Sequence, residues 1–459
     1  MSTLSGHRFY FIGIGGIGMS GLARYFRRRG AEVAGYDRTP SELTNQLLAE
    51  GIDVQFSEDP RLIPAELLEA SAADVMVVRT PAVPTTSPLL GYWTARGARI
   101  LKRAEVLGMI TRDKPTIAVA GTHGKTTVST MIAHLLTQGG VRCNAFLGGI
   151  AANYGTNVLL NDNAVVNVVE ADEYDRSFLQ LCPTQSVITA MDPDHLDIYG
   201  TAEAMFDAYS QFAIQCDGPL LVHERIAGHF SDRSQMRTYA LGSAGEPSAS
   251  NVRVENGAYH FDLHAEGRVL KDLRLGMPGR HNVENAIAAS TVALRLGVSD
   301  DRIRFGLANF RGVARRFEVR INNDMLVFID DYAHHPKELD ACIASARELH
   351  PGRRITGVFQ PHLFSRTRDL ATEFARSLAA LDELILLEIY PAREEPVEGI
   401  TSAWLLDQVP MTSKMLATRD GLVDLIATRP IDVLLTMGAG DIDRVVPALE
   451  RHLNQRHEP

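Results

Sequence analysis

The sequence predicts an α/β fold with three domains. Apolar runs rich in β-branched and aromatic residues alternate with helical stretches along most of the chain, a pattern that is typical of parallel sheets. Two of these runs end in glycine-rich loops, "GIGGIG" and "GTHGKTT", and a helical stretch follows each loop. The length of 459 residues leaves room for roughly three domains of about 150 residues each.

The strand-like runs form three series. The first, with "RFYFIGIGG", "AEVAGYD" and "DVMVVRTPA", predicts a Rossmann-like domain over residues 1–110. The second begins at "TIAVAG" and predicts a central domain of the P-loop ATPase kind over residues 111–313. Within it, short alternating pieces from about Gly242 to Leu275 indicate small inserted antiparallel strands. The third series follows "RRFEVR" and predicts another Rossmann-like domain over residues 314–459.

Composition excludes several classes of protein. The net charge of −10, from 46 basic and 56 acidic residues, argues against a nucleic acid or an acidic membrane as the main partner. No apolar run is long enough to span a bilayer and the first residues lack the apolar core of a signal peptide, so we expect a cytoplasmic protein. The four cysteines include no Cys-x-x-Cys pair, which favours buried thiols over disulfides or a thiolate metal site.

The first glycine loop has the spacing of a dinucleotide-binding turn. Gly13, Gly15 and Gly18 form G-x-G-x-x-G between a strand and a helix, with Gly16 inside the motif. Asp37 ends the next strand, where such folds place a carboxylate for a ribose hydroxyl. We therefore predict a diphosphate site at the helix N-terminus, with a tight structural turn as the alternative.

The second glycine loop is the more specific of the two. Gly121 and Gly124 enclose only two residues, fewer than in the usual P-loop, and Lys125 and Thr126 follow. Backbone N–H groups of such a loop surround phosphates, the lysine neutralises their charge, and the threonine hydroxyl binds Mg²⁺. An exposed lysine at a helix start is the alternative, but a helix N-terminus disfavours a cation unless an anion is bound there.

Two acid-rich strand ends follow, "VVEADEYD" and "DPDHLD". The carboxyl ends of parallel strands meet at one edge of a sheet, so Glu170 and His195 are predicted to converge with Thr126 around a metal ion. A structural histidine is the alternative interpretation of His195.

Over nearly the whole chain, the motifs resemble those of the Mur ligases, a family of enzymes in peptidoglycan synthesis. The resemblance rests on ten motifs in the family's order: "GIGGIGMSGLA", "RAEVLG", "GTHGKTT", "EADEYDRSFL", "DPDHLDIYG", "PGRHNVENAIAA", "FRGVARRFE", "DDYAHHPKE", "FQPHLFSRTRDL" and "GAGDI". They are most similar to the branch of the family that adds L-alanine to UDP-N-acetylmuramate. In this family the shortened phosphate loop holds ATP and the earlier loop holds the UDP-sugar diphosphate.

The resemblance implies a reaction. The γ-phosphate of ATP would pass, with Mg²⁺, to the lactyl carboxylate of UDP-N-acetylmuramate, and the amine of L-alanine would attack the acyl phosphate. It implies a C-terminal domain that binds the amino acid, and the charge of the chain argues against a nucleic-acid or membrane partner. The oligomeric state stays open, with a homodimer as one alternative.

The resemblance also implies roles for individual residues. The catalytic set is Lys125, Arg316, Arg366 and His334. The nucleotide set is Gly121, Thr122, His123, Gly124, Lys125, Thr126, Thr127, His281, Asn282, Asn285, Arg316 and Asp331. The substrate set is Gly13, Gly15, Gly16, Gly18, Asp37, Tyr332, His334 and Arg366, and the metal set is Thr126, Glu170 and His195.

The sequence departs from the family pattern at several points. Leu363 stands where many relatives have an arginine, and Ala190 stands where an asparagine is common. "GIDVQFSEDP" lacks a Gly-His pair and "VVRTPAVP" replaces a serine-rich loop, which leaves the uridine contacts open. No lysine occurs between Lys125 and Lys271, so the carbamylated lysine of several sister ligases has no counterpart in this segment.

Three other functions share part of this pattern. A recycling ligase that attaches a preformed tripeptide also carries "EADEYD", although its longer insertion after this motif is missing. The first glycine loop with Asp37 would also suit an NAD-dependent dehydrogenase, which has no ATP requirement. A non-enzymatic regulator would bind nucleotide without releasing phosphate.

Overall fold

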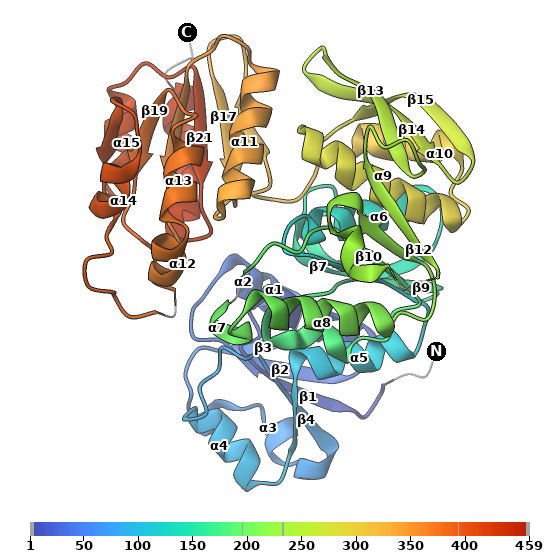
Figure 1. Ribbon diagram of the computed structural model, residues 1–459. Coiled ribbons are helices and arrows are strands. Elements are labelled where there is room, and N and C mark those ends of the chain that lie inside the picture. The colour runs from blue at the N-terminus through green and yellow to red at the C-terminus, as the bar shows by residue number, and fades with distance from the viewer. Residues whose placement is uncertain (1–3, 195, 232–233, 393, 456–459) are drawn as a thin grey trace. The chain divides into compact units, whose positions relative to one another are not determined.

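The computed structural model describes residues 4–194, 196–231, 234–392 and 394–455 (Figure 1). Three sheets succeed one another along the chain, which confirms the predicted α/β class with three sheet-based domains. By its contacts the chain divides into two compact units, the first formed by Met1–Ser250, Asp262–Lys271 and Glu284–Asn309 and the second by the remaining segments. The predicted domain boundaries after residues 110 and 313 stay predictions.

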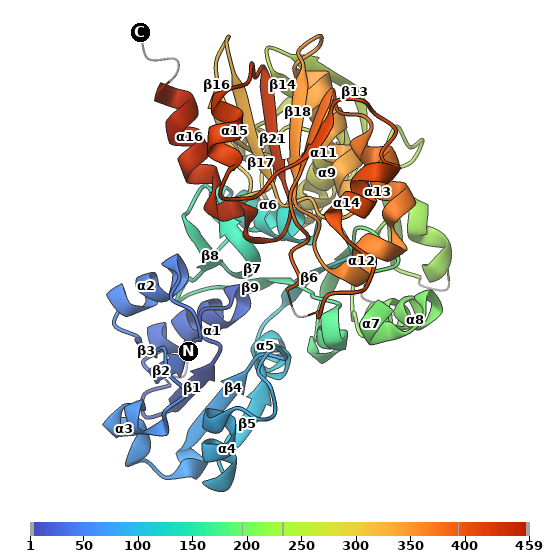
Figure 2. The ribbon, with the colours of Figure 1, turned by 90° about the vertical axis from the view of Figure 1, so that its left-hand side faces the viewer.

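The first sheet has the strand order β3-β2-β1-β4-β5 and is parallel throughout, with β1 next to β4 in Figure 2. The order reverses between β1 and β4, and such reversals are where open α/β sheets bind ligands. The strands are β1 (Arg8–Ile12), β2 (Glu32–Tyr36), β3 (Asp53–Gln55), β4 (Val75–Arg79) and β5 (Arg99–Lys102). The helices are α1 (Ile17–Arg28), α2 (Glu42–Ala49), α3 (Ala65–Leu68), α4 (Pro88–Ala95) and α5 (Arg103–Arg112).

The second sheet has 10 strands in the order β15-β14-β13-β12-β11-β10-β6-β9-β7-β8. Its centre is parallel, and β8 pairs antiparallel to β7 at one edge. The strands are β6 (Thr116–Ala120), β7 (Cys143–Ala151), β8 (Thr156–Leu159), β9 (Val166–Glu170), β10 (Gln185–Ile188), β11 (Leu220–His223), β12 (Met236–Leu241), β13 (Ser248–Glu255), β14 (Ala258–Ala265) and β15 (Arg268–Leu275). The helices are α6 (Lys125–Gln138), α7 (Leu196–Tyr199), α8 (Ala202–Ile214), α9 (Arg280–Arg295) and α10 (Asp300–Asn309).

The predicted antiparallel insert corresponds to β13, β14 and β15. The turns between these strands, Asn256-Gly257 and Glu266-Gly267, have positive φ at both residues, as tight antiparallel hairpins require. The insert does not form a sheet of its own, because β13 pairs in parallel with β12 and so extends the central sheet.

The third sheet has the order β16-β17-β21-β18-β19-β20, and only β16 runs antiparallel to its neighbour. Its inward residues alternate between two clusters, so that Phe359 packs into one and Val358 into the other, and the sheet is covered on both faces. The strands are β16 (Glu318–Asn322), β17 (Val327–Asp331), β18 (Ile355–Phe359), β19 (Glu383–Leu386), β20 (Lys414–Leu416) and β21 (Val433–Met437). The helices are α11 (Pro336–Leu349), α12 (Phe364–Asp369), α13 (Ala371–Leu378), α14 (Ser402–Gln408), α15 (Leu422–Ala427) and α16 (Val446–Gln455).

A buried polar contact joins the first two sheets within the first unit. Asn157 of β8 donates from Nδ2 to the Ile17 carbonyl and, at 3.0 Å, to the Ser20 hydroxyl, both in the first turn of α1. Its Oδ1 accepts from Arg24 at 2.8 Å, and Arg24 also pairs with Glu50. The helix that follows the first glycine loop is therefore bonded directly to the central sheet.

Candidate active site

The first glycine loop is held by the carboxylate of Asp37. Oδ2 of Asp37 accepts a hydrogen bond from the Gly15 N–H at 2.8 Å. A Cβ atom at Gly15 would lie 2.9 Å from that oxygen, so a side chain there would push the carboxylate away. Asp37 thus has an observed role in shaping the loop, and its contact to a ribose stays a prediction.

The second glycine loop needs glycine at both ends. Gly121 and Gly124 have φ values of +134° and +81°, in the region that L side chains rarely adopt. A Cβ at Gly121 would also lie 2.1 Å from Oγ1 of Thr189. Thr189 donates to the carbonyls of Ala120 and His123. The end of β10 therefore closes the base of the loop, a clamp that sequence reasoning missed.

The other predicted residues of this loop are tightly placed. The Thr122 N–H donates to the Ala190 carbonyl at 3.1 Å, so position 190 contacts the loop through its backbone. The Thr122 hydroxyl accepts from the Asp192 N–H at 3.0 Å, and His123 Nε2 lies 3.4 Å from Asp192 Oδ2. Thr127 is buried in the first turn of α6.

Lys125 is held in place by two acceptors. Its Nζ donates to the Gly121 carbonyl at 2.6 Å and to Oε1 of Glu173 at 2.9 Å. Burial alone would lower the pKa of Lys125, but the charges of Glu173, Glu170 and Asp172 outweigh it and raise the pKa above its usual value. The lysine is therefore a cation at neutral pH. Glu173 was absent from the predicted site, although it belongs to the acid-rich "EADEYD" segment.

The predicted metal ligands are placed in part. Thr126 is buried at the start of α6, and Oε2 of Glu170 accepts from the Gly148 N–H at 3.0 Å. A Cβ at Gly148 would lie 2.3 Å from that oxygen, so glycine leaves the space that the carboxylate fills. A hydroxyl and a carboxylate are hard oxygen ligands that fit Mg²⁺. His195 lies outside the described residues, and among those that are described no group of three His, Cys, Asp or Glu side chains could hold a metal ion.

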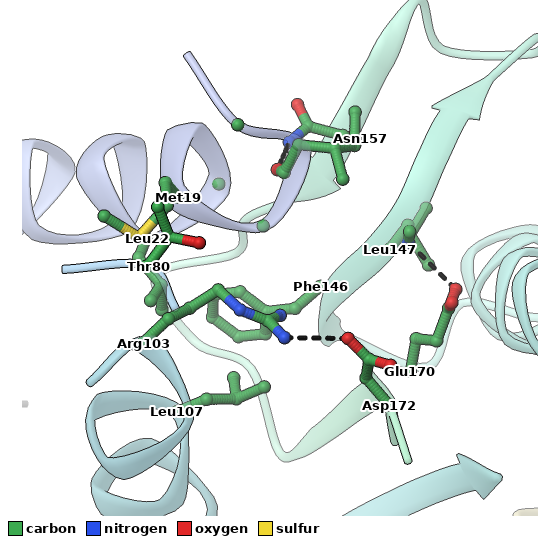
Figure 3. A pocket seen from close by; sticks show the side chains of 15 residues that line it. Met19, Leu22, Thr80, Arg103, Leu107, Phe146, Leu147, Asn157, Glu170 and Asp172 are labelled. Carbon is green, nitrogen blue, oxygen red and sulfur yellow. Dashed lines mark hydrogen bonds and ion pairs between the residues drawn. The ribbon is translucent and has the colours of Figure 1, made fainter. Parts of the chain in front are cut away.

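A cavity of about 320 Å³ extends from the first glycine loop to Glu170, one of the predicted metal ligands (Figure 3). Gly16 and Gly18 line it from the N-terminal sheet, and Glu170 and Asp172 line it from the end of β9. Figure 3 shows Arg103 reaching across it toward Asp172, with Nη2 and Oδ2 3.0 Å apart.

Asn285 lies at the second loop, with its Oδ1 3.0 Å from the point that a Cβ at Gly124 would occupy.

The second unit holds a further group of predicted residues around the end of β17. Asp331 accepts from the N–H groups of Phe317 and Ala333, both at 2.7 Å. Burial raises the pKa of Asp331 to about 7, against the lowering effect of Arg316. The Arg316 guanidinium lies 4.9 Å from the ring centre of Tyr332, a cation–π contact.

His334 is neutral in this environment. Burial lowers its pKa to about 4, with Glu338 opposing the shift and Arg366 adding to it. Its Nδ1 lies 2.9 Å from the Tyr332 carbonyl, and a carbonyl only accepts, so the proton of the neutral ring is on Nδ1. Nε2 then carries a lone pair that can accept a hydrogen bond.

Glu338 is a further residue that sequence reasoning missed. It accepts from the His334 N–H at 3.0 Å and lies 3.7 Å from Arg316 Nη1. Arg366, in α12, is 9% exposed. His281 and Asn282 lie in the first turn of α9, where Asn282 donates to the Pro278 carbonyl.

A strand, a shortened glycine loop and a helix that begins with a half-buried lysine define a nucleotide-binding enzyme of the P-loop kind. Three family models then match in succession: "Mur ligase family, catalytic domain" over residues 8–115, "Mur ligase middle domain" over 119–293, and "Mur ligase, glutamate ligase domain" over 315–440. The chain belongs to the Mur ligase family, and the resemblance predicted from its motifs is confirmed.

Curated proteins and solved structures show which members of the family this chain is similar to. The chain is 49% identical to the UDP-N-acetylmuramate–L-alanine ligase of Porphyromonas gingivalis strain W83, over 97% of this chain and 99% of that protein. It is 46% identical to the ligase of the same name from Flavobacterium johnsoniae, over 97% and 98%. The UDP-N-acetylmuramate-alanine ligase of Thermotoga maritima has a similar structure, with a TM-score of 0.83 and 26% identity over 98% of this chain and 99% of that chain.

Proposed function

We propose that this protein is an ATP-dependent ligase that joins L-alanine to the lactyl carboxylate of UDP-N-acetylmuramate, in peptidoglycan synthesis, and releases ADP and phosphate. Relatives of that name match nearly the full length at 44–49% identity. The observation that carries the proposal is the single cavity that reaches from the first glycine loop to Glu170. A sugar nucleotide bound at the loop extends its acid arm toward the phosphate site.

The charges around the second loop suit phosphoryl transfer to a carboxylate. A carboxylate is a poor electrophile until one of its oxygens becomes a phosphate leaving group. Lys125 neutralises charge on the phosphate that moves, which is the main requirement for such a transfer. Thr126, Glu170 and His195 would hold Mg²⁺, which supplies further positive charge when it is bound.

The second unit supplies groups for the amine. Alanine attacks as a free amine, so its ammonium must lose a proton. With a pKa of about 4, His334 is too weak a base to take that proton, but its Nε2 lone pair suits a hydrogen bond that orients the free amine. The Arg366 guanidinium suits the alanine carboxylate. Arg316, next to Tyr332 and Asp331, is suited to stabilise the transferring phosphoryl group.

The other candidate functions, a recycling ligase and a dehydrogenase, explain fewer of these observations. The murein peptide ligase of Psychrobacter arcticus has a similar fold, with a TM-score of 0.69, but only 21% identity. A dehydrogenase would leave the second glycine loop and Lys125 without a role.

Phosphate release tests the function directly. Purified protein with ATP, Mg²⁺ and UDP-N-acetylmuramate should release phosphate when L-alanine is added, and more slowly with glycine or L-serine. Rapid release with the tripeptide alone would identify the recycling ligase instead. Release that needs no amino acid, or no release with any of them, would overturn the proposal.

Two properties go with this function. No helix in the described parts of the chain has both the length and the apolar character to cross a membrane. A cytoplasmic location and a homodimer stay proposals, to be checked by fractionation and by light scattering.

A further inference from the structure

The cavity of Figure 3 contains a cation that has no assigned role. Arg103, the first residue of α5, is the only Lys or Arg among the 15 described residues that line it. It is 21% exposed and forms an ion pair with Asp172. Glu170 and Asp172 make the rest of the cavity acidic, so an anionic ligand that enters it needs this guanidinium.

Arg103 lies against the first turn of α1. A Cβ atom at Gly18 would lie 2.7 Å from Nη1 of Arg103 and 3.0 Å from its Cδ. The backbone of Gly18 is part of α1 and is not in the left-handed region, so its conformation would accept alanine. Glycine at position 18 therefore leaves the space that the arginine side chain occupies, and a larger residue there would displace the guanidinium.

We infer that Arg103 binds the diphosphate of the sugar nucleotide beside the first turn of α1, and that Gly18 admits the guanidinium to this place. The inference rests on the proposed function. A helix N-terminus attracts phosphate through its N–H groups, and a planar guanidinium next to it adds charge-assisted hydrogen bonds. The ion pair with Asp172 fixes the plane of the guanidinium and leaves other N–H groups for phosphate oxygens.

The lactyl carboxylate is the other anion of the substrate. It has to reach the transferring phosphate near Lys125, whereas Nη1 of Arg103 is next to Gly18 of the first glycine loop. Arg103 is thus a determinant of affinity for the nucleotide diphosphate and does not distinguish between the sugars attached to it.

Binding of three ligands to the full-length protein separates these anions. Isothermal titration with UDP, UDP-N-acetylglucosamine and UDP-N-acetylmuramate should show that Arg103→Ala weakens all three by about the same factor, roughly 10- to 100-fold. Arg112→Ala, an exposed position on the same helix, is the matched control and should change none of them. A loss confined to UDP-N-acetylmuramate, or no loss, would overturn the inference. Failure of the unmodified protein to bind any of the three would overturn the proposed function with it.

A double-mutant cycle tests the pairing with Gly18. Gly18→Ala should weaken UDP binding by about fivefold or more and leave the melting temperature unchanged, because the clash is relieved by moving a flexible side chain. In the Arg103→Ala background the same change should cost less than about twofold. Equal losses in both backgrounds would show that Gly18 serves the loop alone and would contradict the pairing.

Discussion

Lys125 and Glu173 form a buried ion pair at the second glycine loop, with Nζ and Oε2 2.7 Å apart and the two side chains 14% and 1% exposed. The glutamate holds the lysine against the loop. Removing one member of a buried pair is costly because the other charge loses its partner.

Glu173→Ala should therefore lower the free energy of unfolding by about 3 kcal/mol. ATP should stabilise this variant more than the unmodified protein, because phosphate oxygens replace the lost carboxylate beside Lys125. Urea unfolding with and without ATP measures both effects. Asp162→Ala, which removes an exposed ion pair with Arg28, is the control and should change the free energy of unfolding far less than Glu173→Ala does. An equal ATP response in the variant and the unmodified protein would contradict this view of the pair.

Lys125→Ala should abolish ligation and leave sugar-nucleotide binding within about twofold of the original affinity. The lysine contacts the second loop, whereas the diphosphate is expected at the first. Phosphate release measures the loss of ligation, and calorimetric titration with UDP-N-acetylmuramate measures the retained binding. Turnover at the normal rate would remove the second loop from the reaction.

Arg366→Lys should reduce kcat/KM for L-alanine by at least about tenfold, because lysine cannot reproduce a two-point contact with a carboxylate. Arg366 is 9% exposed and is close enough to His334 to lower its pKa. Arg376→Lys is the control, since that side chain is 73% exposed in the same unit. Similar effects of the two substitutions would exclude Arg366 from the amino-acid site.

His334 should make stability depend on pH in acid. Its folded pKa of about 4 is below the ordinary value of 6.5, so the unfolded chain binds the proton more tightly. The stability that neutral His334 contributes is full above pH 6.5 and is lost as the pH falls toward 4, by at most about 3 kcal/mol. Asp331, with a folded pKa of about 7, acts with the opposite sign in this range.

The contribution of His334 is measured by the difference in the free energy of unfolding between the unmodified protein and His334→Gln. The stability of the unmodified protein minus that of His334→Gln should rise as the pH increases from 4 to 6.5 and then level off, in chemical denaturation at each pH. A flat difference curve would mean that His334 titrates normally in the folded state.

Ligation should not depend on dissolved carbon dioxide. No lysine lies between Lys125 and Lys271 to form a carbamate near the metal set, and water can complete the shell of Mg²⁺. The rate should be unchanged after stripping carbon dioxide from the assay. A decrease that bicarbonate reverses would mean that a lysine from another part of the chain supplies the group.

Local patterns in the sequence predicted the sheets and the two glycine loops, because strand, turn and helix signals lie within a few residues of one another. These local patterns did not predict that β13 extends the central sheet, because the pairing of β12 with β13 depends on backbone geometry and not on residue type. The sequence predicts that Asp37 contacts a ribose hydroxyl. The hydrogen bond that the structure shows is the one that Asp37 accepts from the Gly15 N–H.

Two of the residues that sequence reasoning missed, Glu173 and Arg103, have partners at long sequence separations. Glu173 meets Lys125, and Arg103 meets Asp172, from segments that are 48 and 69 residues apart. Each of the four stands inside a recognisable motif, but a motif gives no information about which of its charges will face another. For His195, which is outside the described residues, the metal role stays a prediction.

The contact of Asn157 with the first turn of α1 has a consequence for the geometry of the reaction. Because one amide bonds to the helix start and to Arg24, the first glycine loop is tied to the central sheet that also carries the second loop. A sugar nucleotide bound at the first loop therefore has a defined orientation toward the second loop, and the fold itself supplies part of the loss of rotational freedom that the reaction requires.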